Sequence, residues 1–111
     1  MIQPDEIQKR ALKTWYPVGH PLHNDRLHPI LALAGEAGEL ANLHKKVLYK
    51  LGFKADDLDY IEELGDCLYY VAILAYQLGL TIDDVSRQNR AKLAGGKHGW
   101  PENGGYEEDN E

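Results

Sequence analysis

Apolar residues recur at helical spacing in four stretches of the chain, and no stretch shows the alternating pattern of a half-buried β-strand. In the clearest stretch, six apolar residues follow one another three or four positions apart, and they are expected to form the core stripe of one helix. They are Ile61, Leu64, Leu68, Val71, Ala75 and Leu78. The pattern predicts an all-α protein in which four helices with short connections form a four-helix bundle.

Helix-capping residues and helix-breaking glycines indicate where these helices are expected to begin and end. The expected bounds are Pro4–Trp15, His28–Lys50, Asp56 or Asp57 to Leu78, and Thr81–Leu93, with a loop over Tyr16–Leu27. Gly52 and Gly79 are natural residues at helix C-termini, because glycine adopts the left-handed backbone conformation readily. Thr81 and Asp84 have the spacing of a capping arrangement at the start of the fourth helix.

The third helix is apolar around much of its circumference, more than a small bundle on its own requires, which predicts burial against another subunit. The length of 111 residues fits one small domain, expected over residues 1–100. Residues 102–111 contain five acidic side chains and no Lys or Arg, so most of the net charge of −6 lies there. This composition predicts an acidic, disordered tail over residues 101–111.

Targeting and redox signals are absent from the sequence. Cys67 is its one cysteine, which excludes an intramolecular disulfide and fits a reducing compartment. The pattern of a signal peptide is missing, and the longest apolar run is too short and too often interrupted to cross a bilayer. No membrane association is expected.

Two acidic pairs are the main chemical signal of the chain. Glu36 and Glu39, and then Glu63 and Asp66, are each spaced i, i+3, so both carboxylates of a pair lie on one helix face. A glycine precedes the second acid of each pair, at a cost of about 1 kcal/mol relative to alanine inside a helix. Like charges at this spacing also repel. Solvated acidic faces are the simpler alternative, but the repetition within apolar stretches favours a site for hard divalent cations.

The types of ligand indicate which metal such a site would hold. His20, His23 and His28 lie near prolines, without a cysteine partner or an HExxH motif, which favours loop or substrate-contact roles over zinc binding. The Glu-x-x-His pairs of carboxylate-bridged di-iron bundles are also missing. The four carboxylates would form an all-oxygen site, which favours Mg²⁺ or Mn²⁺.

Four motifs follow one another in a characteristic order. They are Leu33-Ala-Gly-Glu-Ala-Gly-Glu-Leu40, Lys45-Lys46, Glu63-Leu-Gly-Asp-Cys-Leu-Tyr-Tyr70 and Asn89-Arg-Ala-Lys-Leu93. The ordered set resembles the MazG-like nucleotide pyrophosphohydrolases of the all-α NTP pyrophosphatase superfamily, over about two-thirds of the chain. Many members of that family carry a glutamate where this chain has Gly35, so the resemblance does not assign a general base to this position.

The resemblance implies an oligomeric enzyme that hydrolyses a nucleoside triphosphate to the monophosphate and pyrophosphate, with a purine deoxynucleotide as one candidate substrate. Mg²⁺ is the expected cofactor, with Mn²⁺ as a substitute and two or more ions per site. The implied metal ligands are Glu36, Glu39, Glu63 and Asp66, and the implied catalytic residues are Glu36, Glu39 and Lys92. The expected partners are the nucleotide and further copies of the chain, as a dimer or a tetramer built as a dimer of dimers, without a nucleic-acid polymer. The expected location is the cytosol of a bacterial or phage-infected cell.

Further residues are expected to contact the substrate through their chemistry or through the resemblance. They are Trp15, His23, Asn24, Lys46, Tyr70, Asn89, Lys92 and Lys97. The cationic side chains would meet phosphate, and an aromatic platform beside an amide is a common way to hold a base. For Trp15, core packing and base stacking are equally open, and Lys46 could also be ordinary surface charge.

Two other functions compete with this interpretation. Relatives in the family also process phosphoribosyl intermediates, so the substrate could be a pyrophosphate that is not a nucleotide. From another class, the chain could be a non-catalytic helical interaction protein whose acidic pairs hold a structural cation or face solvent. Dependence of pyrophosphate release on Mg²⁺ or Mn²⁺ separates an enzyme from such a protein.

Overall fold

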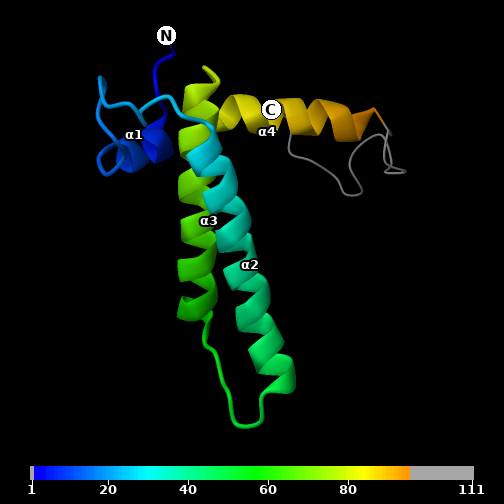
Figure 1. The fold of residues 1–111 in the computed structure, drawn as a ribbon. Helices are drawn as coiled ribbons and strands as arrows, with labels where there is room; N and C mark the ends of the chain where they lie inside the picture. The colour runs from blue at the N-terminus through cyan, green and yellow to red at the C-terminus, as the bar shows by residue number, and fades with distance from the viewer. Residues whose placement is uncertain (1, 96–111) are drawn as a thin grey trace.

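The computed structural model describes residues 2–95, and in this part of the chain it contains four α-helices and no strand. The helices are α1 (Glu6–Leu12), α2 (Leu27–Tyr49), α3 (Asp57–Gln77) and α4 (Ile82–Ala94). Figure 1 shows α2 and α3 as a long antiparallel pair, with α1 and α4 on opposite sides of the upper end of α3. The all-α prediction is confirmed. The expected substrate contact Lys97 and the expected tail lie outside the described residues.

Side-chain caps begin three of the helices. Asp5 caps α1, so Pro4 precedes the cap and does not lie within the first turn as expected. Asp56 caps α3, and Thr81 caps α4 in a reciprocal capping box with Asp84, as the sequence predicted. Gly52 and Gly79 have φ angles of 82° and 79°, which confirms the expected role of both glycines after the ends of α2 and α3.

The start of α2 is held by a residue outside the helix. The Asp25 carboxylate accepts hydrogen bonds from the backbone N–H groups of Leu27 and His28, at 3.3 and 3.4 Å. Pro29 follows in the first turn and is buried. Proline is tolerated there because the first backbone N–H groups of a helix have no partner within the helix. The helix therefore begins one residue before the predicted position.

The four helices do not form the closed bundle expected from the sequence. Helix α3 packs against α1, α2 and α4, and no other pair of the described helices packs extensively. The reason is the direction of α4, which leaves the end of α3 at 93° and does not run back along it. None of the described helices is by itself long and apolar enough to span a membrane; the bent pair α3 and α4 meets that criterion by length and composition only.

The core lies where α1 and the following segment meet the C-terminal half of α3. Ala11, Trp15, Ala72 and Ile73 form one buried apolar cluster. Gln8 is also fully buried, and its side-chain amide donates to the Leu80 carbonyl at 2.7 Å and to the Ala72 carbonyl at 3.4 Å. This polar side chain therefore ties α1 to the connection between α3 and α4, a role that the sequence pattern did not reveal.

The core stripe predicted on α3 was wrong for most of its members. Of the six residues, only Ala75 is buried. Ile61, Leu64, Leu68 and Leu78 are exposed. Their helical spacing is as predicted, but within one chain α1 covers only the C-terminal half of this face and α4 turns away from the rest. The surplus of apolar surface expected on the third helix is thus present in the structure.

Candidate metal centre

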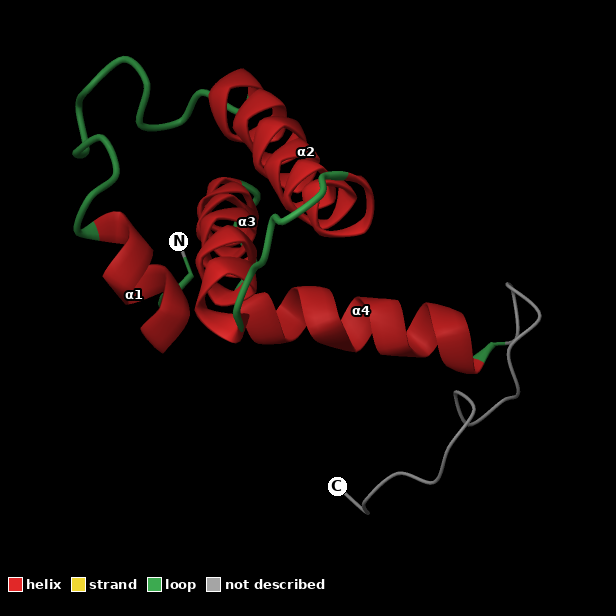
Figure 2. Cartoon of the chain, turned by 90° about the horizontal axis from the view of Figure 1, so that it is seen from below, coloured by secondary structure: helices red, strands yellow, loops and turns green. Residues whose placement is uncertain are grey.

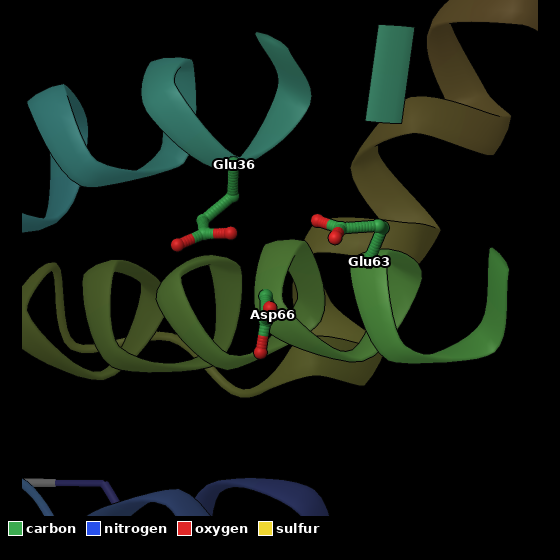
Figure 3. Close-up of side chains that lie close together, drawn as sticks. All are labelled: Glu36, Glu63 and Asp66. Atoms are coloured by element: carbon green, nitrogen blue, oxygen red, sulfur yellow. The ribbon is translucent and has the colours of Figure 1, made fainter. Parts of the chain in front are cut away.

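The antiparallel packing of α2 against α3 brings the two acidic motifs together. One carboxylate oxygen each of Glu36, Glu63 and Asp66 lies within 4.8 Å of the other two. Figure 3 shows the Glu36 side chain pointing from α2 toward α3, which carries Glu63 and Asp66 one turn apart. The i, i+3 spacing places the two α3 carboxylates on one side of the helix, and the register of the hairpin brings α2 opposite them.

The carboxylates of this cluster lie in an unfavourable environment without a cation. Glu36 and Glu63 are half-buried, and the Oε2 atom of Glu63 is buried without a hydrogen-bond partner. Burial raises the pKa of the Glu36 carboxyl above its usual value, and nearby negative charges, that of Asp66 most strongly, raise it further. Burial likewise raises the pKa of Glu63, with Asp66 again the strongest charge effect. Crowded carboxylates with no cationic partner in the part of the chain that the structure describes suit a divalent ion with oxygen ligands.

The fourth expected ligand, Glu39, lies beside the cluster without joining its closest group. Its side chain is exposed, and its charge contributes to the raised pKa values of both Glu36 and Glu63. The glycines of the two motifs do not serve a close contact with any part of residues 2–95. A Cβ atom built on Gly35, Gly38 or Gly65 would meet no atom within 4 Å apart from the local helix backbone.

Tyr70 lies one turn after Asp66 on α3, next to the carboxylates. Burial raises the pKa of its hydroxyl above the usual value, and the charges of Glu36 and Asp66 are among the smaller contributions in the same direction. Its ring packs edge-on against Tyr69 with centroids 5.0 Å apart and lies 6.3 Å from the ring of His28. The hydroxyl therefore stays protonated at neutral pH and can donate a hydrogen bond to an anion beside the cluster.

Trp15 and His23 belong to the packing between the first loop and α3. Trp15 is 7 % exposed, and its indole N–H donates to the His23 carbonyl at 3.0 Å. His23 is 5 % exposed, and its Nδ1 atom lies 2.7 Å from the Tyr16 carbonyl. Trp15 is therefore part of the core cluster, and its role in holding a base stays a prediction. Asn24, the third candidate for the base, is exposed on the same loop.

The expected phosphate contacts are spread over two helices. Lys46 is exposed on α2, with its ammonium 5.8 Å from the centre of the Phe53 ring. Asn89 and Lys92 are exposed on α4. Because Figures 1 and 2 show α4 projecting away from the paired helices, the structure does not bring these two residues to the carboxylates of the same chain.

Sequence reasoning missed the polar residues that hold the surroundings of the site in place. The Gln77 amide donates to the carbonyls of His23 and Asp25, at 3.1 and 3.0 Å. On α2, the Nδ1 atom of His44 lies 2.9 Å from the Tyr60 hydroxyl of α3. A glutamine near a helix end has no local signature of such a role, because its partners are distant in sequence.

Comparison with known proteins agrees with the resemblance seen in the motifs. The family model described as MazG nucleotide pyrophosphohydrolase domain matches residues 26–99, which include all four carboxylates. The Gene 37 protein of Mycobacterium phage L5 is 46 % identical over 68 residues, which cover 57 % of this chain and 58 % of that protein. The chain thus spans little more than half the length of this relative. No solved structure matches the chain. With a family model matched over most of its length, the chain belongs to the MazG nucleotide pyrophosphohydrolase domain family.

Proposed function

We propose that the protein is a metal-dependent pyrophosphohydrolase that converts a nucleoside triphosphate, ribo- or deoxyribo-, and water to the monophosphate and pyrophosphate. The observation that carries the proposal is the cluster of Glu36, Glu63 and Asp66, whose carboxylate oxygens approach within 4.8 Å across two helices. Membership of the MazG family supports the same chemistry. Purine deoxynucleotides are the first substrates to test.

The residues present suit Mg²⁺, with Mn²⁺ as a substitute and two or more ions per site. Glu36, Glu39, Glu63 and Asp66 would hold the ions, and the unpartnered Oε2 atom of Glu63 has the chemistry of a metal ligand. When bound, the ions would neutralise the phosphate charge and lower the pKa of the attacking water. The raised pKa values of Glu36 and Glu63 mean that their ionised forms are disfavoured in the metal-free protein, and a bound cation would stabilise those forms.

The remaining chemistry falls to side chains of the chain itself. Water forms a bond to the α-phosphorus, the bond from that phosphorus to the bridging oxygen breaks, and pyrophosphate leaves. A carboxylate of the cluster, Glu36 or Glu39, accepts the proton of the water, which general-base catalysis requires to lie within hydrogen-bond reach. The Tyr70 hydroxyl beside the cluster donates to a phosphate oxygen, and Lys46 offsets phosphate charge farther along α2.

The nucleoside would lie toward the loop before α2, where Asn24 is exposed and His23 and Trp15 form the wall behind it. Lys92 and Asn89 would reach phosphate from another copy of the chain, because α4 projects away from its own cluster. Lys97, outside the described residues, stays a phosphate contact on the resemblance alone. The proposed functional unit is therefore a homo-oligomer, a dimer or a dimer of dimers. The exposed leucines of α3 support association, since large apolar residues in one face favour a partner.

The decisive experiment measures pyrophosphate release from a panel of canonical and damaged nucleoside triphosphates, with Mg²⁺, with Mn²⁺ and with a chelator. The expected result is release only with metal, together with the monophosphate in equal amount. Hydrolysis in ¹⁸O-labelled water then identifies the attacked atom: label in the monophosphate means attack at the α-phosphorus, and label in pyrophosphate contradicts it. A phosphoribosyl pyrophosphate compound in the panel tests the alternative substrate class.

Matched variants distinguish the effect of losing a carboxylate of the cluster from the effect of changing the net charge. Glu63→Gln and Asp66→Asn are expected to abolish turnover and to weaken Mn²⁺ binding measured by calorimetry. Glu62→Gln removes the same charge from the neighbouring, exposed position, which lies outside the cluster, and should leave both intact. Metal binding without turnover of any pyrophosphate compound would favour the non-catalytic interaction protein with a structural cation.

A further inference from the structure

Two aromatic side chains are stacked on each other in the loop that joins α1 to α2 (Figure 1). The rings of Tyr16 and His20 have centroids 4.6 Å apart, and their planes are inclined by only 25°. Tyr16 is half-buried, and His20 is exposed. The imidazole therefore adds little to the core, and its ring remains accessible to a ligand.

The His20 side chain is held in one orientation although it is exposed. The Leu22 backbone N–H donates to its Nδ1 atom at 3.0 Å. The His20 backbone N–H donates to the Pro17 carbonyl at 3.0 Å, and Gly19, with a φ angle of 92°, allows this tight turn. Ordering an exposed side chain costs conformational entropy, and His20 buries little surface to offset that cost. A binding surface benefits from such a ring, because the ligand meets it already ordered.

Tyr16 is held from the side of the core. Trp15 packs edge-on against its ring, with centroids 5.0 Å apart. The Tyr16 carbonyl lies 2.7 Å from the Nδ1 atom of His23. Trp15 and His23 are only 7 and 5 % exposed. The two buried residues therefore support Tyr16 from behind, and Tyr16 and His20 are the more accessible rings of this loop.

A row of rings connects the stack with the carboxylate cluster. The His28 ring, in the first turn of α2, lies 5.7 Å from the Tyr16 ring and 6.3 Å from the Tyr70 ring. Tyr70 follows Asp66 by about one turn of α3. A substrate with its phosphates at the carboxylates can therefore extend past Tyr70 and His28 toward the stack. The order of these groups suits the order of phosphate, sugar and base in a nucleotide.

We propose that the base of the substrate stacks on the exposed ring of His20, with Tyr16 behind it, and that this contact selects substrates that carry a planar base. Every nucleobase has a π-face, so stacking accepts nucleotides of any base and disfavours a pyrophosphate compound without one. A purine buries more apolar area than a pyrimidine, so the stack favours purine nucleotides. The proposal rests on the function proposed above and decides between a nucleotide and the phosphoribosyl alternative.

Calorimetry with two ligands, each in the presence of Mg²⁺, separates binding of the base from binding of the phosphates. One is a deoxyadenosine triphosphate analogue whose α,β-bridging oxygen is replaced by NH, and the other is inorganic tripolyphosphate. His20→Ala is expected to weaken binding of the analogue about tenfold, the effect of losing one stacking ring, and to leave binding of tripolyphosphate unchanged. His20→Phe keeps a planar ring and should recover most of the lost affinity.

Val18→Ala is the matched control, because Val18 is 81 % exposed in the same loop. This variant should bind both ligands as the unsubstituted chain does. Equal affinity of His20→Ala and the unsubstituted chain for the analogue would overturn the proposal, and so would an equal loss of affinity for both ligands. Tripolyphosphate that binds the unsubstituted chain as tightly as the analogue would overturn the selection for a base.

The binding measurements do not depend on turnover, so the two proposals can fail separately. A protein that binds the analogue through His20 but releases no pyrophosphate from any triphosphate would contradict only the proposed reaction. A protein that releases pyrophosphate with full activity in His20→Ala, at an unchanged KM, would contradict only the stacking contact.

Discussion

Trp15 and His23 are joined to each other by a hydrogen bond of 3.0 Å from the indole N–H to the histidine carbonyl. The same carbonyl accepts the amide of Gln77 at 3.1 Å, and that amide also donates to the Asp25 carbonyl. The loop is thus tied to the end of α3 just before α2 begins. Since the Asp25 carboxylate also accepts hydrogen bonds from the first backbone N–H groups of α2, the loop fixes the position from which the helix carrying Glu36 starts.

Trp15→Phe is expected to lower the free energy of unfolding by about 1 kcal/mol, the net contribution of one hydrogen bond, because the His23 carbonyl keeps Gln77 as a partner. Gln77→Met should cost more, about 1–3 kcal/mol, since the part-buried Asp25 carbonyl loses this donor and the His23 carbonyl loses one of its two. Urea unfolding measures both. If Trp15→Phe left stability unchanged but raised KM tenfold, the ring would be a nucleotide contact.

The local parts of the fold were predictable from the sequence, and the global packing was not. The capping box of Thr81 and Asp84 could be predicted because it depends on residues three positions apart. The i, i+3 spacing of each acidic motif places its carboxylates on one side of a helix, which was enough to predict that Glu36 would lie near Glu63 and Asp66. The exposure of Leu64 depends on the direction in which α4 leaves α3. Periodicity identifies an apolar face but not the chain that covers it. Gln8 was missed for a similar reason, because its main partner, the Leu80 carbonyl, is distant in sequence.

Glu63→Gln is expected to stabilise the metal-free protein and abolish turnover. The substitution removes one of several crowded negative charges and leaves an amide of the same shape. Thermal unfolding with a chelator measures the gain. Glu62→Gln is the control and should gain less, because that exposed residue lies outside the cluster and its charge makes the smallest contribution to the raised pKa of Glu63. A metal-free fold that collapsed in the Glu63 variant would contradict the assignment of Glu63 as a ligand.

The pH dependence of the metal-free fold follows from the same carboxylates. The folded-state pKa values of Glu36 and Glu63 are raised above those of the unfolded chain, near 4.3. As the pH rises, the two carboxyl groups therefore lose their protons in the unfolded chain before they do so in the folded protein. The free energy of unfolding falls as the pH increases through and above the unfolded-state pKa. Their unfavourable contribution should disappear at lower pH. Comparing unfolding of the unsubstituted chain and Glu63→Gln at several pH values should show a difference that grows from pH 4 to neutrality.

Thr81→Val should destabilise the protein by about 1 kcal/mol through loss of the α4 cap. The backbone N–H of Thr81 and then its hydroxyl lower the pKa of Asp84 in the folded protein. The ionised carboxyl therefore stabilises the fold at pH values above its pKa in the unfolded chain. This stabilisation is lost as the pH falls toward its pKa in the folded protein. In Thr81→Val, NMR titration should show the pKa of Asp84 moving up toward its usual value. Ser86→Ala, one turn into the exposed side of α4, should change neither quantity.

Deletion of residues 102–111 is expected to leave turnover within about twofold. This segment contains five acids, no Lys or Arg and one large apolar residue, Tyr106, so its composition offers no cation for a triphosphate. Steady-state kinetics of the shortened chain test the expectation under the metal conditions of the full chain. A tenfold loss would mean that the acidic segment takes part in the reaction or in closing the site.

Tyr70→Phe should raise KM about tenfold, the effect of losing one hydrogen bond to a charged group. The pKa of the Tyr70 hydroxyl is raised by burial, by Tyr69 and by the nearby carboxylates, so the hydroxyl remains a donor at neutral pH and can meet a phosphate oxygen beside Asp66. Tyr69→Phe is the matched control, since its hydroxyl pairs with Thr14 at 3.2 Å, on the α1 side of α3. It should lower stability slightly and leave KM unchanged. Equal KM values in the two variants would remove Tyr70 from the substrate site, whereas a rise confined to Tyr70→Phe would place the phosphates on the side of α3 that carries Asp66 and Tyr70.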